Sequence, residues 1–440
     1  MSEKYRPKLH FSPARGWMND PNGMIHIDGV YHLFFQHDPD STLHRTMHWG
    51  HASSTDLTSW THHPIALYPD EEGTCFSGSA IETPEGEVKL FYTAHQRSAE
   101  GEDYQRQMLV HANRALDHFE RGASNPVVPN PGLTCFRDPK VVWHEPSQRW
   151  IMVLTHGQSM GFYGSTDLVS WELLSTFGEG QGKHGPGPWE CPDMVQLTAP
   201  DGRKLWVLIV SIGADAMGPG TGVQYFIGDF DGREFINANP VETVLWLDSG
   251  RDHYATQTFF DRSGGAPIAM SWSGNGIYAQ QTPTEAFRGV MTLPREMHLV
   301  ETVDGLRVVA RVPAQALAAF PAEMQDGVGH ITQRYDLAVG EAADLTLFGE
   351  AQAQYTISRT AQDRGTIRTQ RGEREGMRKY EHDYLVDVIW PEGGLDLTLF
   401  LDRGFVEISA AGGQTWITNL FYPEDTNIAP MQSAARKAAA

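Results

Sequence analysis

From the start of the chain to about residue 310, short apolar and aromatic segments alternate with clusters of Gly, Pro, Asp and Asn. The clearest segments are Val30–Phe35, Val88–Tyr92, Trp150–Leu154 and Leu205–Val210. Short runs of Val, Ile, Phe, Tyr and Trp bounded by turn residues are typical of β-strands. No long stretch with helical periodicity competes with this pattern. The pattern therefore predicts an all-β domain of many short strands.

An internal repeat indicates how these strands are organised. The segment Ser54–Trp60 (STDLTSW) recurs as Ser165–Trp171 (STDLVSW), about 110 residues later, which equals two blades of a propeller with roughly 55 residues per blade. Segments with candidate site residues follow one another at about the same 50 to 60 residue spacing, at Asp20, Phe76, Asp138, Glu190 and Asp252. Five blades that each send one segment to the central axis would make these groups converge.

The pattern changes after the predicted propeller. Pro313–Ala319 is rich in Ala and Pro, and we expect a linker over 311–330. Alternating strand patterns resume in Ala353–Ile357, Leu395–Leu399 and Val406–Ile408, as expected for a β-sandwich. The predicted domains are thus a propeller over 1–310, a sandwich over 331–430 and a flexible tail over 431–440.

Composition and charge limit the classes of partner. The chain has 440 residues, 40% hydrophobic and 20% charged, which is typical of a globular protein. Its net charge of −21 argues against nucleic acid and anionic membranes as partners, because both require a basic surface. A neutral small molecule suits such a surface better. Sequence does not decide between a monomer and a homo-oligomer.

The cysteines and histidines suggest neither disulfides nor a metal. Cys75, Cys135 and Cys191 are odd in number and widely spaced, as expected for reduced thiols in a cytoplasmic protein. The longest apolar run, Leu205–Ile212, is too short to cross a bilayer, and no cleavable leader is recognised; secretion stays open if a leader has been removed. No metal-ligand spacing occurs among the 19 histidines, so we expect no metal and no cofactor.

Three motifs place a carboxylate in a fixed backbone. Trp17–Gly23 (WMNDPNG) holds Asp20 in a turn stiffened by Pro and shaped by Gly. Phe136–Pro139 (FRDP) and Trp189–Asp193 (WECPD) each present an acid next to Pro or bulky neighbours. An isolated Asp-Pro or Asn-Gly is an ordinary turn, and Glu190 alone could be a loop acid, so the argument depends on the three motifs together.

Together these motifs resemble glycoside hydrolase family 32, which includes invertases, fructanases and sucrose-phosphate hydrolases. The resemblance continues in further motifs along nearly the whole chain: Gln36, Trp49–His51, Phe76–Ser79, Tyr254–Ala255 with Gln257, Leu293–Glu296, Asp402–Arg403 and Val406–Glu407. It implies a five-bladed β-propeller followed by a β-sandwich. It also implies that Asp20 is the nucleophile, Glu190 the acid/base and Asp138 the transition-state stabiliser of a retaining hydrolysis through a covalent fructosyl-enzyme.

Elementary electrostatics gives expectations for the three acids. Clustered carboxylates cannot all ionise at their ordinary pKa values, so at least one pKa is raised. Glu190, between Trp189 and Cys191, is expected to have the less polar surroundings and to keep its proton. Asp138, beside Arg137, is expected to be charged.

The resemblance also suggests a substrate-binding shell. Hydrogen bonds to sugar hydroxyls would come from Asn19, Gln36, Ser77 and Arg137, and apolar walls from Trp49, Phe76, Tyr254 and Trp272. Many family members have a Trp about five residues before the Trp-Gly-His motif, where this chain has His44. We expect His44 to line the leaving-group side of the pocket and to alter the preference for the leaving group.

Several functions fit these residues. The first is a β-fructofuranosidase acting on sucrose or short fructo-oligosaccharides. The alternatives are a fructosyltransferase, an exo-fructanase acting on inulin or levan, and a sucrose-6-phosphate hydrolase. A catalytically dead sugar-binding propeller or another five-bladed furanosidase family fits less well. The negative surface favours neutral fructosides over a phosphate ester, although Arg45 or Lys183–His184 could reverse this locally.

Overall fold

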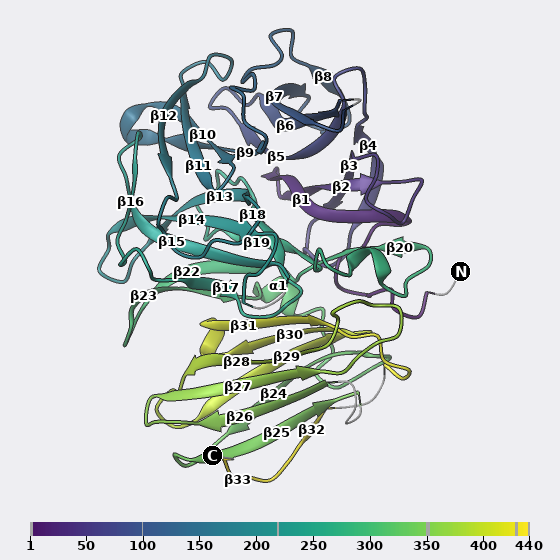
Figure 1. The fold of residues 1–440 in the computed structure, drawn as a ribbon, viewed down its shortest axis with the longest axis vertical. Coiled ribbons are helices and arrows are strands. Elements are labelled where there is room, and N and C mark those ends of the chain that lie inside the picture. Colours follow the sequence, from purple (N-terminus) through teal and green to yellow (C-terminus); the bar gives the residue numbers. More distant parts are fainter. Residues whose placement is uncertain (1–2, 99, 218–219, 349–352, 427–429, 439–440) are drawn as a thin grey trace.

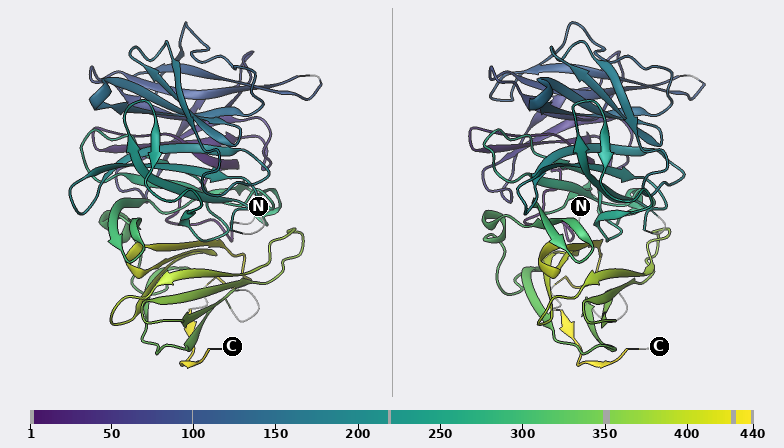
Figure 2. Two further views of the ribbon diagram at one scale, coloured as in Figure 1. Left: turned by 60° about the vertical axis from the view of Figure 1, so that its left-hand side comes forward. Right: turned by 90° about the vertical axis from the view of Figure 1, so that its left-hand side faces the viewer.

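The computed structural model describes residues 3–98, 100–217, 220–348, 353–426 and 430–438. Nearly all regular structure in these residues is β-strand. Two bodies are visible: a ring of small sheets built from the first three quarters of the chain, and a two-layer sandwich built from the last quarter (Figure 1). The side views show the same division, with the sandwich packed against one edge of the ring (Figure 2).

Five sheets form the ring within the described residues, which confirms the predicted five-bladed propeller. The first blade contains β1 (Gly16–Ile27), β2 (Val30–Asp38), β3 (His48–Ser54), β4 (Thr61–Leu67) and β20 (Phe287–Arg288). The second contains β5 (Thr74–Glu82), β6 (Val88–Arg97), β7 (Asp103–Ala112) and β8 (Phe119–Arg121). The third contains β9 (Phe136–His144), β10 (Arg149–His156), β11 (Ser159–Ser165) and β12 (Glu172–Phe177).

The last two blades are more elaborate. The fourth contains β13 (Trp189–Thr198), β14 (Lys204–Ile212), β15 (Gly222–Phe230), β16 (Phe235–Asn237) and β17 (Leu245–Asp248). The fifth contains β18 (Tyr254–Thr258), β19 (Ile268–Ser273), β21 (Val290–Met291), β22 (Arg295–Thr302) and β23 (Gly305–Arg311). The short strand β20 pairs in parallel with β1 of the first blade, so a late segment of the chain closes the ring.

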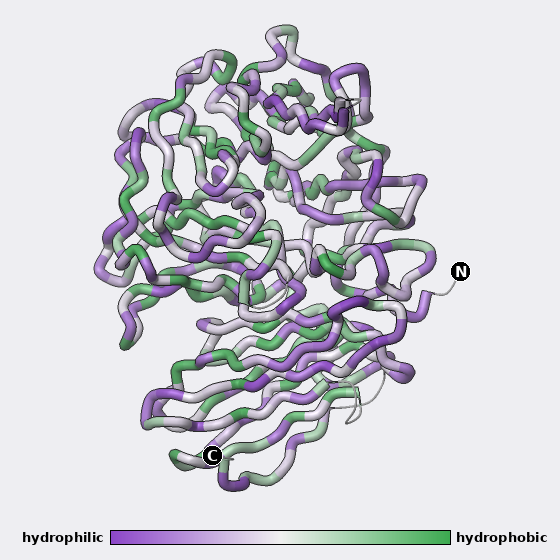
Figure 3. Tube along the Cα trace, in the orientation of Figure 1, coloured by the Kyte–Doolittle hydropathy of each residue, from purple (hydrophilic) through white to green (hydrophobic). Residues whose placement is uncertain are grey.

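Apolar packing between blades holds the ring together. The innermost strands β1, β5, β9, β13 and β18 contact one another around the axis. A buried hydrophobic cluster fills the space between each pair of neighbouring blades. Phe34 and Leu90, for example, belong to the cluster between the first and second blades. In Figure 3 the hydrophobic stretches accordingly run along the strands, and hydrophilic positions gather at the turns.

The sequence repeat corresponds to the same turn in the first and third blades. Ser54–Trp60 links β3 to β4, and Ser165–Trp171 links β11 to β12. In both turns the Ser hydroxyl accepts from the Leu amide, at 2.7 Å and 2.8 Å, and that Leu has positive φ. The Asp carboxylate accepts from the amide of the second Ser in both copies. The predicted two-blade spacing of the repeat is therefore correct.

The second body is the predicted β-sandwich. One sheet contains β24 (Val328–Tyr335), β29 (Leu395–Asp402), β30 (Phe405–Ala410) and β31 (Thr415–Leu420). The other contains β25 (Glu341–Leu347), β26 (Ala353–Arg359), β27 (Arg364–Arg371), β28 (His382–Ile389), β32 (Met431–Gln432) and β33 (Arg436–Lys437). Inward-facing residues of both sheets form one hydrophobic core, as the alternating sequence pattern requires.

The connecting and terminal segments differ from the prediction in detail. The linker contains one helical turn, α1 (Ala314–Leu317), and β24 begins at Val328, slightly earlier than the predicted 331. In the tail, for which we expect flexibility over 431–440, the described residues 430–438 run along the edge of the sandwich, where β32 and β33 both pair with β25; residues 439–440 lie outside the described residues. These hydrogen bonds cover part of an open sheet edge, which stabilises a segment that has little apolar character.

Candidate active site

The innermost strand of every blade is irregular at the same point. Between Met18 and Pro21, β1 has one residue more than the facing stretch of β2. The same one-residue excess occurs in β5, β9, β13 and β18. The bulged pairs are Asn19–Asp20, Phe76–Ser77, Asp138–Pro139, Cys191–Pro192 and Ala255–Thr256. A bulge redirects side chains out of the regular alternation, so five blades can aim residues at one end of the axis.

Three of the bulges contain a non-glycine residue with left-handed backbone. The φ angles are 63° at Asp138, 47° at Cys191 and 55° at Ala255. Such backbone costs free energy and persists where the surroundings fix it. Here side-chain oxygens accept from the three amides: Thr93 Oγ1 from Asp138, Asp138 Oδ2 from Cys191, and Ser211 Oγ from Ala255. These three hydrogen bonds link the second blade to the third, the third to the fourth and the fourth to the fifth.

A cavity of about 700 Å³ lies over these bulges. Eleven of the twelve predicted site residues line it: Asn19, Asp20, Gln36, His44, Phe76, Ser77, Arg137, Asp138, Glu190, Tyr254 and Trp272. The three motif carboxylates thus meet in one place, although they are far apart in sequence. The remaining walls come from Trp17, Arg45, Thr74, His95, Arg97, Asp103, Gln105, Gly276, Ala279 and Gln280.

Asp20 is one of the buried residues that line the cavity. Its Oδ2 accepts from Ser77 Oγ at 2.7 Å and lies 3.4 Å from the Cys191 thiol, which also donates to it. Burial raises the pKa of Asp20 above its ordinary value, the hydrogen bonds from Ser77 and Asn19 oppose this, and the charge of Glu190 adds to it. These donors orient the carboxylate and stabilise its charged form.

Glu190 is held between a cation and a phenol. Arg137 donates to Glu190 Oε1 from Nη2 at 2.7 Å and from Nε at 3.2 Å. Tyr254 donates its hydroxyl to Glu190 Oε2 in a short hydrogen bond. The predicted apolar surroundings of Glu190 are therefore wrong, because two strong polar partners contact its carboxylate.

Asp138 also differs from the electrostatic prediction. Its Oδ2 accepts from the Cys191 amide at 2.9 Å and lies 3.8 Å from Arg137 Nε. Burial raises the pKa of Asp138 to about 7, although Arg137 opposes the rise; the charge of Glu190 adds to it. Arg137 favours the charged form of Asp138, as expected, but burial outweighs this effect, and the guanidinium donates its hydrogen bonds to Glu190 and not to Asp138.

Trp49 is the predicted site residue that does not line the cavity. Its side chain is fully buried and packs against Phe34 and Tyr92. Its indole N–H donates to the Phe76 carbonyl oxygen at 2.9 Å. Trp49 is therefore placed to support the Phe76 bulge from behind, and the prediction that its ring forms a wall is wrong.

His44 lines the cavity, as expected from its position before the Trp-Gly-His motif. Its ring stands edge-on to Trp17 at 6.0 Å and to Phe76 at 6.2 Å. Burial lowers the pKa of His44, while the charge of Asp20 opposes this. The His44 ring therefore lies between two aromatic rings of the cavity wall. This is the place where the resemblance described above leads us to expect a Trp.

Sequence reasoning missed the wall formed by the second blade. His95 stacks on Phe76 with 4.1 Å between ring centres, and its Nε2 contacts Asp103 Oδ1 at 2.9 Å. Arg97 lies 3.9 Å from the same carboxylate. These residues lie on β6 and β7, outside the innermost strand, so no motif next to a bulge marks them. Trp17 and Cys191 were inside the motifs but had no predicted role.

In residues 3–98, 100–217, 220–348, 353–426 and 430–438, no group of three His, Cys, Asp or Glu side chains is arranged to hold a metal ion. Over the same residues, every helix is too short or too polar to span a bilayer. Cys75, Cys135 and Cys191 are free thiols.

Three carboxylates in a cavity at the axis of a five-bladed propeller, next to a sandwich, define a glycoside hydrolase. Residues 10–310 match the "Glycosyl hydrolases family 32 N-terminal domain", and residues 330–437 match "Glycosyl hydrolases family 32 C terminal". The chain belongs to glycoside hydrolase family 32.

Similar proteins include enzymes with several names. A levanase of Bacillus subtilis is 36% identical over 464 residues, which cover 96% of this chain and 67% of that protein. An invertase of Schizosaccharomyces pombe is 38% identical over 317 residues, covering 67% of this chain and 53% of that protein. The chain spans 36% of a levanase of Bacillus sp. strain L7. The crystal structure of an exo-inulinase from Aspergillus awamori has 27% identity and a TM-score of 0.84, with 98% of this chain and 95% of that one covered.

Proposed function

We propose that the protein is a retaining β-fructofuranosidase that releases fructose from sucrose or short fructo-oligosaccharides. The observation that carries the proposal is the meeting of Asp20, Asp138 and Glu190 in one cavity, each held by named donors. Support also comes from similarity to proteins named levanase and invertase, and to a solved fructofuranosidase from Schwanniomyces occidentalis complexed with fructosylnystose, at 25% identity.

In the first step Glu190 donates its proton to the glycosidic oxygen while Asp20 attacks the anomeric carbon. The bond to the leaving group breaks, and a covalent fructosyl ester forms on Asp20. Ser77 orients the attacking carboxylate, and Arg137 and Tyr254 fix both oxygens of Glu190. Asp138 stabilises the developing positive charge and binds ring hydroxyls. Water then attacks the anomeric carbon while Glu190 takes a proton from that water; the bond from this carbon to Asp20 breaks, fructose is released, and the free enzyme is restored.

Separate substitutions test the two central roles. Asp20→Asn should abolish hydrolysis of every fructoside, because no nucleophile remains. Glu190→Gln should lower the rate by about 10² to 10⁴ for sucrose and less for an aryl fructoside, whose leaving group needs less protonation. A fructosyl ester on Asp20 should accumulate in Glu190→Gln and be seen by mass spectrometry of the quenched enzyme. Glu172→Gln is the matched control, since Glu172 is exposed at the start of β12. An adduct on another residue, or fructose released with inverted configuration, would contradict the proposal.

An exo-fructanase is the second candidate. His95, Arg97 and Asp103 on β6 and β7 line the same cavity as the three acids, and its volume of about 700 Å³ supports binding of further sugar units. Proteins named levanase and exo-inulinase are among the relatives. The ratio of kcat/KM for sucrose, a trisaccharide, inulin and levan on one preparation separates the two candidates. Product analysis at high sucrose concentration detects transfer of fructosyl groups to sugar.

Arg45 and Arg97 also line the cavity, which is a specific observation in favour of a phosphorylated substrate. The net charge of −21 opposes such a substrate at long range. We keep neutral sucrose as the preferred substrate, because Arg97 lies beside Asp103, which offsets its charge. A larger kcat/KM for sucrose 6-phosphate than for sucrose would reverse this choice.

We also propose a cytoplasmic location. The free thiols of Cys75, Cys135 and Cys191 support it, because reduced cysteines are common in reducing compartments. Activity recovered from the medium of intact cells, and absent from lysed cells, would contradict this location.

A further inference from the structure

Strand β31 of the sandwich accepts hydrogen bonds from the segment that leads into β18. The Ser249 amide donates to the Trp416 carbonyl oxygen at 2.7 Å, and the Asp252 amide donates to that of Thr418 at 3.1 Å. Gly250 lies so close to β31 that an added Cβ would be 2.1 Å from the Thr418 oxygen. The backbone just before Tyr254 is therefore fixed by a strand of the other domain.

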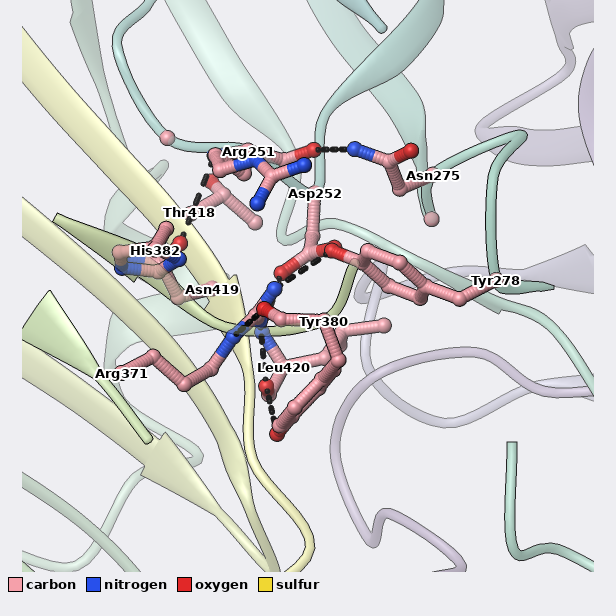
Figure 4. A network of polar contacts seen from close by, with 12 residues as sticks. Arg251, Asp252, Asn275, Tyr278, Arg371, Tyr380, His382, Thr418, Asn419 and Leu420 are labelled. Atoms are coloured by element: carbon pink, nitrogen blue, oxygen red, sulfur yellow. Dashed lines mark hydrogen bonds and ion pairs between the residues drawn. The ribbon is translucent and has the colours of Figure 1, made fainter. Parts of the chain in front are cut away.

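Arg371, the last residue of β27, crosses this interface with its whole side chain buried. Its Nη1 donates to Asp252 Oδ2 at 2.6 Å and to the Leu420 carbonyl oxygen at 2.8 Å. Its Nη2 donates to the Tyr278 hydroxyl at 2.6 Å, and Nε donates to the Tyr380 carbonyl oxygen at 2.9 Å. Figure 4 shows the guanidinium of this sandwich residue pointing at Asp252 and Tyr278, which belong to the propeller.

Asp252 connects this ion pair to the catalytic acid. It lies two residues before Tyr254, whose hydroxyl donates to Glu190 Oε2. Gly213 packs against the hydrogen-bonded side chains of Tyr254 and Glu190. A Cβ added to Gly213 would lie 2.9 Å from Glu190 Oε2 and 3.5 Å from the Tyr254 hydroxyl. A shift of the Asp252 backbone would move Tyr254 and disturb the hydrogen bond to Glu190.

Tyr278 connects the same guanidinium to the cavity wall. Its hydroxyl also donates to Asp252 Oδ1, and the next two residues, Ala279 and Gln280, line the cavity. Asn275 stiffens this loop, since its Nδ2 donates to the Arg251 carbonyl oxygen at 2.8 Å and its carbonyl accepts from the Ala279 amide at 2.9 Å. One guanidinium thus holds both the segment before Tyr254 and the loop beside it.

We propose that Arg371 is a positioning residue for the acid/base Glu190, acting from the sandwich through Asp252, Tyr278 and Tyr254. The proposal rests on the role of Glu190 given above. Arg371 contacts neither the cavity nor substrate. Its planar fork satisfies four acceptors in fixed directions, a geometry that the single ammonium of Lys cannot reproduce. The sandwich is therefore part of the machinery that aims the proton donor.

The test is the dependence of kcat/KM on the leaving group in the full-length protein. Arg371→Lys should lower kcat/KM for sucrose by about tenfold and that for an aryl fructoside by less than about threefold, because a misplaced acid matters most when the leaving group needs a proton. The quantity to compare is the ratio of kcat/KM for sucrose to kcat/KM for the aryl fructoside. Tyr278→Phe keeps the ring and removes the shared hydroxyl, so it should lower this ratio as Arg371→Lys does. It replaces Arg371→Lys in the test if that variant does not fold. The matched control is Arg364→Ala. Arg364 begins the same strand and pairs with Asp304 of the propeller at 2.6 Å, far from the cavity along β27.

The outcomes separate a positioning role of Arg371 from a merely structural one. A merely structural role reduces the amount of active enzyme and lowers both kcat/KM values by the same factor, which would overturn the proposal, as would no change in either variant. Arg364→Ala should leave the ratio unchanged. Glu190→Gln is measured in the same series. A ratio unchanged in Glu190→Gln refutes the proposed role of Glu190, whereas a ratio that changes in Glu190→Gln and not in the Arg371 and Tyr278 variants overturns only the positioning role.

Discussion

The indole N–H of Trp49 donates to the carbonyl oxygen of Phe76 at 2.9 Å, from a side chain that substrate cannot reach. Phe76 lies in the bulge of β5, where the ladder of backbone hydrogen bonds is interrupted. The Trp49 ring therefore supplies a partner that the strand itself does not provide. This relationship makes Trp49 a support of the cavity wall rather than part of it.

We expect Trp49→Phe to raise KM several-fold with a smaller change in kcat, because Phe76 loses its fixed position while the three carboxylates stay in place. Leaving the buried carbonyl without its donor should lower the free energy of unfolding by about 1 to 3 kcal/mol. Steady-state kinetics and denaturant unfolding measure both effects. Trp143→Phe is the control, since Trp143 donates to Glu145 away from the cavity; an equal rise of KM there would remove the special role of Trp49.

His44→Trp should change the order of preference among natural fructosides. The larger ring would stand between Trp17 and Phe76, where the imidazole now lies. We expect kcat/KM for sucrose relative to a trisaccharide to change by at least about threefold, and kcat/KM for an aryl fructoside to change less, since its reaction depends chiefly on the fructosyl pocket. An unchanged order of substrates would place His44 outside the leaving-group side.

Asp138→Asn should stabilise the fold at alkaline pH. The pKa of Asp138 is raised to about 7 by burial, so the folded protein keeps a proton that the unfolded chain loses from about pH 4 upward. The stability of the natural protein falls through this window, and the cost reaches up to about 4 kcal/mol above pH 7. The Tm difference between variant and natural protein should be small at pH 4 and largest at pH 8, while activity is lost at both.

Asp167→Asn gives the opposite sign and serves as the control for Asp138→Asn. Amides of Ser170 and Val169 lower the pKa of Asp167 to about 2, so its charge stabilises the fold above pH 4 and this contribution disappears as the pH falls through about 2. This variant should therefore have a lower Tm than the natural protein at pH 8. A Tm at pH 8 that is lowered in both variants would show that the sign assigned to Asp138 is wrong.

His10 should make the domain interface sensitive to alkaline pH. It contacts Asp402 and Glu407 of the sandwich, each at 2.9 Å. Burial lowers the pKa of His10, but the two carboxylates outweigh it and raise the pKa to about 9. A raised folded-state pKa contributes stability that is complete below pH 6.5 and is lost as the pH rises through 9, roughly 3 kcal/mol in total.

The natural protein should accordingly exceed His10→Gln in Tm at pH 6, and the difference should shrink by pH 10. Calorimetry across this range measures it. His118→Gln, which changes an exposed histidine, should show no such trend. A difference that stays constant from pH 6 to pH 10 would mean that His10 acts by shape alone.

The fold could be predicted because its signals are local. The repeated Ser54–Trp60 turn follows the period of the blades, and the alternation after residue 330 follows the two faces of the sandwich sheets. The two short strands of the tail could not be predicted, since they depend on a free edge of β25, which lies far away in sequence.

The site was predictable where a motif and a bulge coincide, as at Asp20 and Asp138. His95 and Asp103 lie on β6 and β7, where no bulge motif marks them, although both line the cavity. The surroundings of Glu190 were predicted wrongly for a related reason. Arg137 neighbours Asp138 in sequence, but the bulge turns the guanidinium to Glu190 on the next blade.

Because the five innermost strands share a one-residue excess, different residues of each strand hold the blade together and present side chains to the cavity. Residues on either side of each bulge keep their cross-strand partners, whereas the bulged pair has none to lose. Side chains such as Phe76 and Ser77 can therefore be exchanged without changing the register of a blade. Catalytic acids and wall residues are thus carried on the same kind of bulge, and a library that varies only Phe76, which faces the cavity and carries no acid, should yield mostly folded, active proteins with altered sugar preferences.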